Sequence, residues 1–211
     1  MIVASVIVAA GSGVRYGSKK QLEVVKNGKI VLDYSVEKLS EFGKVYIVAK
    51  REDMEFLEKR YGVSVVEGGR ERKHSVFNGL KAVGDCNVVL IHDAARPVLD
   101  SLNVELLIYT ALKFGAAIFY LPIYETVKLI KGKNAIATLD RRRLIISQTP
   151  QAFDFRKLFS IMKKYVGEWN FTDEAALWEK IFGSVKLVEG SRKNIKITTK
   201  EDMEIVRCLL G

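Results

Sequence analysis

The sequence is poor in the residues that form zinc sites and disulfide frameworks. Among 211 residues there are only two cysteines, two histidines and three prolines. Cys86 and Cys208 lie far apart and lack the CxxC spacing of a metal site, so we expect neither bound zinc nor a disulfide framework. Such sparse cysteine usage fits a cytoplasmic protein.

Long hydrophobic runs are also missing. No apolar run reaches the roughly 18 residues that a membrane-spanning helix needs, so we expect no membrane partner. The first ten residues are apolar, but no basic segment precedes them and a glycine-rich loop follows. We interpret them as a buried strand rather than a signal peptide.

The net charge of +9 can be interpreted in two ways. The excess of lysine and arginine fits a solvated basic surface, or a cleft that attracts phosphates. The sequence shows no basic–aromatic interleaving and no zinc-finger spacing, so nucleic acid is not an expected partner.

Short β-branched runs alternate with stretches of helical period. The runs predict buried strands at 2–9, 45–48, 63–66, 88–91 and 116–121. Two of the helical stripes are Leu32, Val36 and Leu39, and then Leu106, Tyr109 and Lys113. This alternation predicts an α/β fold with a mostly parallel twisted sheet flanked by helices.

The second half breaks this rhythm. Short strand candidates at 126–131, 135–139 and 144–148 indicate a protruding β-hairpin arm at about 124–148. Helices are expected near 156–165 and 173–182, then a strand pair at 185–188 and 195–198, and a last helix from Lys200. We find no internal repeat, so we expect a single domain over 1–211, arm included.

A glycine loop follows the first strand and holds Gly11, Gly13, Arg15, Lys19 and Lys20. Glycines allow the backbone to approach a ligand closely and to point N–H groups at an anion. The spacing matches neither the dinucleotide-binding pattern nor the Walker pattern. The cations could clamp a triphosphate, or the segment could be a turn with solvated lysines.

Three later segments offer further polar side chains. Gly69 and Ser75 lie between a strand and a helix, where they could bind a base or form a turn and a cap. A buried strand ends at His92 and Asp93, at the sheet edge where open α/β folds bind ligands. A carboxylate there suits Mg²⁺, or could cap a helix or form a buried ion pair, and Arg96 could grip a phosphate.

Near the C-terminus, Thr172 fits the N-cap of the next helix, or a phosphate site at that helix N-terminus. Lys196 is predicted on a strand with Ile195 and Ile197 facing the other way, so it points into a cleft or into water.

Taken together, these segments resemble the 2-C-methyl-D-erythritol 4-phosphate cytidylyltransferase family of the non-mevalonate isoprenoid pathway. The matching stretches, in the family's order, are AAGSGVRY, VVEGGRERKHSV, IHDAARP, QTPQAF, FTDE and NIKIT. The family usually has Pro-Lys-Gln in the first loop, whereas here Lys19 and Lys20 precede Gln21. We assign the loop lysine to Lys20 because it directly precedes the glutamine.

The resemblance implies a Rossmann-like nucleotidyltransferase fold, Mg²⁺ as cofactor, and a homodimer that exchanges its β-arms. It implies that the enzyme converts CTP and the methylerythritol phosphate to 4-diphosphocytidyl-2-C-methyl-D-erythritol and pyrophosphate. The implied residues are catalytic Arg15, Lys20 and Lys196; the metal ligand Asp93; CTP-binding Ala10, Gly11, Gly13, Gly69 and Ser75; and substrate-binding Arg96, Thr149 and Thr172, with Thr126 and Arg141 from the partner's arm.

Two rival functions compete with this one. A cytidylyltransferase for another polyol phosphate, such as ribitol 5-phosphate, would share the loop motifs and differ only in its acceptor pocket. A nucleotide-binding regulatory module would not need Arg15, Lys20, Asp93 and Lys196, so their presence favours an enzyme.

Overall fold

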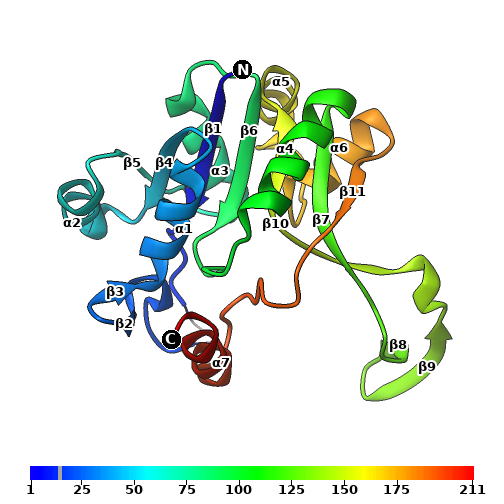
Figure 1. Cartoon of the computed structure of the whole chain (residues 1–211). Coiled ribbons are helices and arrows are strands. Elements are labelled where there is room, and N and C mark those ends of the chain that lie inside the picture. Colours follow the sequence, from blue (N-terminus) through cyan, green and yellow to red (C-terminus); the bar gives the residue numbers. More distant parts are fainter. Residues whose placement is uncertain (14–15) are drawn as a thin grey trace.

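The computed structural model describes residues 1–13 and 16–211. Its main sheet has seven strands in the order β11-β7-β10-β6-β1-β4-β5 (Figure 1). Only β10 runs antiparallel to its neighbours, and the other pairings are parallel, as the sequence predicts. The strands are β1 (Val3–Val8), β4 (Lys44–Ala49), β5 (Ser64–Glu67), β6 (Val88–Asp93), β7 (Ala116–Pro122), β10 (Ile145–Asp154) and β11 (Lys186–Glu189).

Helices cover both faces of this sheet, because alternate strand side chains point to opposite sides. Ile7 packs in a hydrophobic core on one face of the sheet, and its neighbour Val6 packs in a second core on the other face. The first core is closed by α1 (Val31–Ser40), α2 (Arg51–Tyr61) and α4 (Ser101–Phe114). The second core is closed by α3 (Arg72–Val83), α5 (Phe155–Tyr165) and α6 (Glu174–Phe182).

A third, smaller core lies under the C-terminal helix α7 (Lys200–Leu210). Helix α7 packs against the short strand β2 (Val24–Lys26), which follows the 3₁₀ turn η1 (Lys20–Leu22) and pairs with β3 (Lys29–Ile30). Thr199 and Asp202 form the expected capping box at the start of α7. The C-terminal helix therefore returns to the neighbourhood of the first loop (Figure 1).

The predicted apolar stripe on α4 is wrong. Leu106 and Tyr109 are 53% and 64% exposed, whereas Val104, Leu107, Ile108 and Ala111 are buried against the sheet. The helix carries two apolar stripes of helical period, so periodicity alone could not choose the face that packs.

The strand expected at 195–198 is also wrong. That segment forms no strand; Ile197 is buried, and its N–H donates to the Ala95 carbonyl at 2.9 Å. The chain there leaves β11 at the sheet edge and crosses to α7. Conversely, β10 continues well beyond the predicted end at 148, because Pro150 falls at a register shift where a proline is tolerated in a strand.

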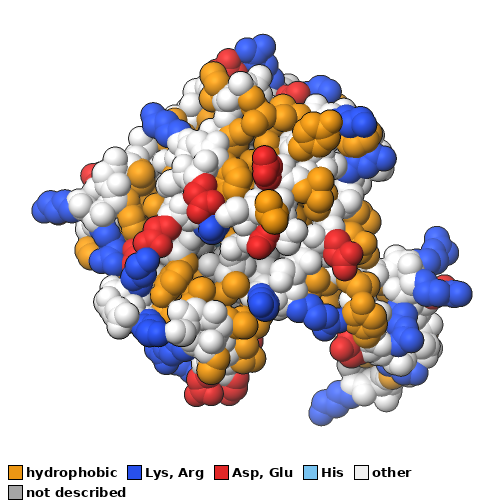
Figure 2. Space-filling model, in the orientation of Figure 1, with side chains coloured by type: hydrophobic (Ala, Val, Ile, Leu, Met, Phe, Trp, Pro, Cys, Tyr) orange, Lys and Arg blue, Asp and Glu red, His pale blue; other side chains and the backbone are white. Residues whose placement is uncertain are grey.

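The segment after β7 forms a hairpin of β8 (Val127–Lys131) and β9 (Asn134–Leu139), followed by the 3₁₀ turn η2 (Arg141–Arg143). The hairpin stands away from the main sheet in Figure 1 and projects from the body of the molecule in Figure 2, and Ile130 and Ile136 are exposed. Its function as an intersubunit arm stays a prediction.

Leu106 and Leu107 test which face of α4 packs. Leu107→Ala should lower the free energy of unfolding by about 2–5 kcal/mol, because it leaves a cavity in the core. Leu106→Ala should change it by less than about 0.5 kcal/mol. Urea unfolding of both variants measures this, and equal losses would contradict the observed orientation.

Candidate active site

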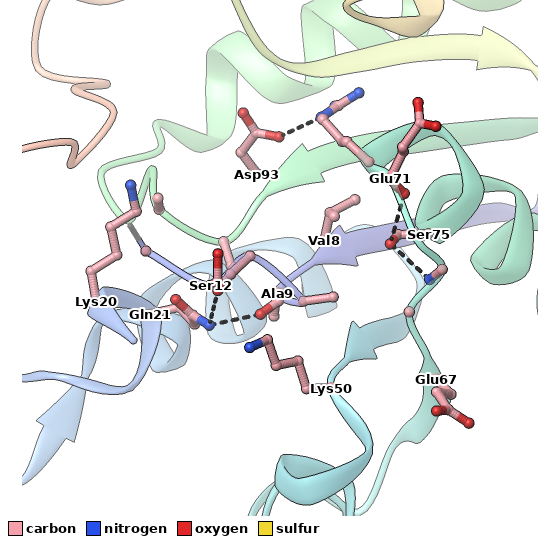
Figure 3. A pocket seen from close by; sticks show the side chains of 18 of the residues that line it. Val8, Ala9, Ser12, Lys20, Gln21, Lys50, Glu67, Glu71, Ser75 and Asp93 are labelled. Atoms are coloured by element: carbon pink, nitrogen blue, oxygen red, sulfur yellow. Dashed lines mark hydrogen bonds and ion pairs between the residues drawn. The ribbon is translucent and has the colours of Figure 1, made fainter. Parts of the chain in front are cut away.

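A cavity of about 680 Å³ opens at the C-terminal ends of β1, β4, β5 and β6. Open α/β sheets bind their ligands at this edge. Figure 3 shows this cavity with the first glycine loop on one side and the turn between β5 and α3 on the other. The predicted site residues that line it are Ala10, Gly11, Gly13, Lys20, Gly69, Ser75, Asp93 and Lys196.

The first glycine loop is held in shape by its own backbone and by Gln21. Gly13 has φ +67°, and a Cβ there would lie 1.9 Å from the Ser18 carbonyl oxygen, so only glycine fits. The Gln21 amide donates to the carbonyls of Ala9 (2.8 Å) and Gly11 (3.2 Å), as the dashed lines in Figure 3 show. These contacts fix the described part of the loop, residues 9–13, against Gln21 and Ser18. Sequence reasoning used Gln21 only as a landmark and missed this function.

The two loop lysines face different surroundings. The Lys19 ammonium pairs with Asp53 at 2.7 Å and Glu52 at 3.0 Å, at the start of α2. Lys20 lines the cavity instead. Arg15, the third predicted cation of this loop, lies outside the described residues.

The opposite wall is built by Gly68, Gly69 and Ser75. The Ser75 hydroxyl accepts from the Gly69 N–H at 3.0 Å and donates to the Glu71 carbonyl at 3.2 Å. A Cβ at Gly68 would lie 2.5 Å from that of Ala10, so this wall passes close to the first loop. Ser75 therefore shapes the turn, which is one of the two readings that its sequence allowed.

Asp93 lies at the end of β6 between two cations. Its Oδ1 accepts from Arg72 Nε at 3.1 Å, and its Oδ2 accepts from Lys196 Nζ at 2.6 Å. Burial alone would raise the pKa of Asp93, but Arg72, Lys196 and Arg96 hold that pKa well below its usual range. The carboxylate therefore stays ionised at neutral pH.

Arg72 also binds a second carboxylate. Its Nη1 donates to both oxygens of Glu174 at 2.9 Å, and the Glu174 side chain is completely buried at the start of α6. Burial raises the pKa of Glu174 although Arg72 opposes the shift. Sequence reasoning missed both residues, because they are 102 positions apart and neither stands out locally.

His92 is buried directly behind Asp93. Its Nε2 lies 3.1 Å from the Arg96 carbonyl, which can only accept, so Nε2 carries the hydrogen. Its Nδ1 then accepts from the Thr149 hydroxyl at 3.2 Å, while Thr149 accepts from the Asp93 N–H at 3.0 Å. Burial lowers the pKa of His92 to about 4. The ring therefore supports the Asp93 backbone as a neutral group.

The predicted acceptor-binding residues do not line the cavity of this chain. Arg96 donates to the Asn194 carbonyl at 2.8 Å. Thr172 is exposed and does not cap α6; the N-cap is Asp173, whose carboxylate accepts from the Ala176 N–H, so that expectation is wrong. Thr126 and Arg141 flank the β8–β9 hairpin, and neither lines the cavity.

The donor set near Asp93 suits a metal that shares its ligands with a nucleotide. No cluster of three or more His, Cys, Asp or Glu side chains that could hold a metal occurs in the described ranges 1–13 and 16–211. A Mg²⁺ ion usually takes only one or two carboxylates and completes its shell with phosphates and water. An ionised Asp93 facing the cavity fits that requirement.

Comparisons with known proteins point to the same family that the sequence motifs resemble. The family model for 2-C-methyl-D-erythritol 4-phosphate cytidylyltransferase matches residues 3–211. Curated enzymes of that name from Halalkalibacterium halodurans and Dictyoglomus thermophilum are 38% and 39% identical, covering 98% and 95% of this chain and 96% and 93% of their own. The crystal structure of 4-diphosphocytidyl-2C-methyl-D-erythritol synthase from Anaerococcus prevotii matches with a TM-score of 0.84 at 31% identity, covering 99% of this chain and 96% of its own.

The buried neutral state of His92 predicts a loss of stability in acid. The folded-state pKa of about 4 lies below the ordinary value of 6.5, so the unfolded chain binds the proton more readily. Stability from this group is complete above pH 6.5 and falls by up to about 3 kcal/mol as the pH drops toward 4. Urea unfolding across this range should show a smaller pH effect in His92→Asn. Identical pH dependence in both proteins would contradict the prediction.

Proposed function

The chain belongs to the 2-C-methyl-D-erythritol 4-phosphate cytidylyltransferase family, and on that premise we propose which of its residues carry out the reaction. The enzyme joins CTP to 2-C-methyl-D-erythritol 4-phosphate and releases pyrophosphate, forming 4-diphosphocytidyl-2-C-methyl-D-erythritol for isoprenoid synthesis. Ribitol 5-phosphate is not the favoured acceptor. The observation that ties the reaction to the cavity is the convergence there of the glycine loop, Asp93 and Lys196.

The chemistry requires positive charge and alignment more than it requires a base. A phosphate oxygen of the acceptor attacks the α-phosphorus of CTP in line with the departing pyrophosphate. A phosphate monoester is already largely ionised near neutral pH, so no side chain has to remove a proton from it. His92 cannot act as a base toward the cavity, because both ring nitrogens are engaged in the protein interior.

We assign CTP to the space between the first glycine loop and the Gly69 wall. The backbone at Ala10, Gly11 and Gly13 would lie against the nucleotide. Gly69 and Ser75 would border the base from the opposite wall. The glycine at position 68 supports this placement, because a Cβ there would lie 2.5 Å from that of Ala10 and would narrow the space between the two walls.

Asp93 is the proposed Mg²⁺ ligand. The metal, when bound, neutralises charge on the triphosphate. Asp93 Oδ2 is at present paired with Lys196, whose side chain is 40% exposed and can turn toward the phosphates. Asp93 can therefore exchange an ammonium for a metal without becoming an unpaired buried charge.

Arg15, Lys20 and Lys196 are the proposed catalytic cations. They would stabilise the charge that builds around the α-phosphorus as the new bond forms. Lys20 and Lys196 both line the cavity although they lie at opposite ends of the chain. Lys19 is not assigned, because it does not line the cavity.

The acceptor site is proposed to combine two subunits. Arg96, Thr149 and Thr172 would come from one chain, and Thr126 and Arg141 from the hairpin of the other. This arrangement is supported by the hairpin, which contributes no residue to the lining of the cavity in its own chain and stands away from the main sheet (Figure 1). The exposed Leu129, Ile130 and Ile136 on the hairpin also supply apolar surface for a homodimer.

We further propose that the 211 residues form one nucleotidyltransferase domain. No helix in the part of the chain that the structure describes is long and apolar enough to cross a membrane. The cytoplasmic location stays a prediction from cysteine usage.

The reaction is tested by pyrophosphate release from purified protein with CTP, Mg²⁺ and each candidate acceptor. We expect turnover with 2-C-methyl-D-erythritol 4-phosphate and little with ribitol 5-phosphate. Equal or greater turnover with ribitol 5-phosphate would overturn the acceptor assignment. Binding of CTP without turnover of any acceptor would support a regulatory module instead.

The cationic residues should affect turnover more than folding. Lys20→Ala and Lys196→Ala should each lower kcat on the order of 10²–10³-fold, because each removes a donor that acts in the transition state. Lys19→Ala is the matched control and should have a mild effect. Steady-state pyrophosphate release beside a thermal melt measures this. Near-normal kcat in both Lys20→Ala and Lys196→Ala would refute the assignment.

Sharing of sites between subunits predicts complementation. Arg141→Ala chains have an intact loop and Lys20→Ala chains have an intact hairpin, so a mixed dimer should regain one working site. Each homodimer of a single variant should be nearly inactive. Heterodimers isolated with two different tags provide the assay, and failure of an isolated heterodimer to recover activity would place Arg141 outside the partner's site.

A further inference from the structure

Arg72 occupies a central position that the proposed reaction does not explain. It begins α3, lines the cavity, and binds Asp93 through Nε and Glu174 through Nη1. The dashed line at Asp93 in Figure 3 marks the first of these contacts. One guanidinium thus connects three elements, namely α3, the end of β6 and the start of α6.

We propose that Arg72 is the positioning residue for the Asp93 carboxylate: it fixes Oδ1, so that Oδ2 is presented to the metal–triphosphate. This inference rests on the proposed magnesium site. Positioning partners of metal ligands orient the ligand and preserve its charge, and their loss typically lowers metal affinity 10–100-fold.

The two cations on Asp93 differ in how firmly they are held. Lys196 makes one contact with the carboxylate, at Oδ2, and its side chain is 40% exposed. Arg72 is anchored at a second point by the fully buried Glu174 and is 27% exposed. Lys196 can therefore leave Oδ2 when a metal arrives, while Arg72 keeps Oδ1 in place.

The geometry requires a guanidinium specifically. Its planar fork directs N–H groups at two carboxylates at once, whereas the ammonium of a lysine is a point charge on a flexible stem. A lysine at position 72 could bind Asp93 or Glu174 but could not hold both in their present orientations. Glu174, which has no other cation bound to it among the described residues, in turn fixes the rotamer of Arg72.

A merely structural ion pair must be distinguished from a positioning residue. Arg72→Met alone leaves Glu174 as an uncompensated buried charge and would destabilise the fold. Replacing a buried ion pair by two apolar side chains of similar size is often neutral for stability. The double variant Arg72→Met/Glu174→Met should therefore fold and melt close to the wild type while Asp93 loses its positioning partner.

The readout is direct binding of Mn²⁺, as a probe for Mg²⁺, to the protein–CTP complex by electron paramagnetic resonance. We expect Mn²⁺ affinity to fall about 10–100-fold in the double variant and by less in Arg72→Lys. CTP affinity measured by calorimetry in chelator should stay near the wild-type value in both. The matched control is Arg156→Met, which breaks an exposed pair with Asp85 and should not change Mn²⁺ affinity.

Wild-type Mn²⁺ affinity in a folded double variant would overturn the inference and leave the pair a purely structural one. If the double variant fails to fold, wild-type affinity in folded Arg72→Lys would overturn it equally. Asp93→Asn separates this inference from its premise: unchanged Mn²⁺ affinity in that variant would refute the proposed metal ligand itself, whatever Arg72 does.

Discussion

The ionised Asp93 carboxylate is the interaction on which the rest of the site depends. It accepts from Arg72 at one oxygen and from Lys196 at the other, so it brings α3 and the segment after β11 to the end of β6. Arg72 in turn compensates the completely buried Glu174 and holds the start of α6. Arg96 also lies close enough to lower the pKa of Asp93. If Asp93 were neutral, the positive charges of Arg72, Arg96 and Lys196 would repel one another at this end of the sheet.

The parts of the site that follow directly from a strand could be predicted from the sequence. The glycine loop and Asp93 each end a β-branched run, and the ends of parallel strands meet at one edge of the sheet. The contact between Arg72 and Glu174 could not be predicted in this way, because it joins residues 102 positions apart and no local pattern marks either partner. His92 belongs to the same class: the sequence shows a histidine beside a carboxylate, and only the fold shows that both ring nitrogens face inward.

The errors in the predicted fold have one physical source, which is that local patterns permit more than one packing. Helix α4 has apolar stripes on two faces, and the stripe that contains Leu107 packs against the sheet. Residues 195–198 alternate like a strand, but Ile197 hydrogen-bonds to the Ala95 carbonyl instead of pairing with β11 at the edge of the sheet. Pro150 suggests the end of a strand, yet β10 continues through it because the register shifts there.

An enzyme that joins two anions must hold positive charge in its cavity before either substrate arrives. An isolated buried cation would lower the stability of the fold, because it loses its hydration without gaining a partner. The cations here are therefore held in ion pairs, and these pairs differ in how easily they break. Lys19 is bound by two carboxylates, Glu52 and Asp53, whereas Lys196 contacts only one oxygen of Asp93 and is partly exposed. Around Asp93 and Glu174 the cations Arg72, Arg96 and Lys196 exceed the carboxylates by one, and burial lowers the pKa of Arg96, which means that its charge is incompletely compensated. In the proposed reaction this local excess of positive charge would favour an incoming phosphate, and Lys196 would move to that phosphate while the metal takes its place beside Asp93.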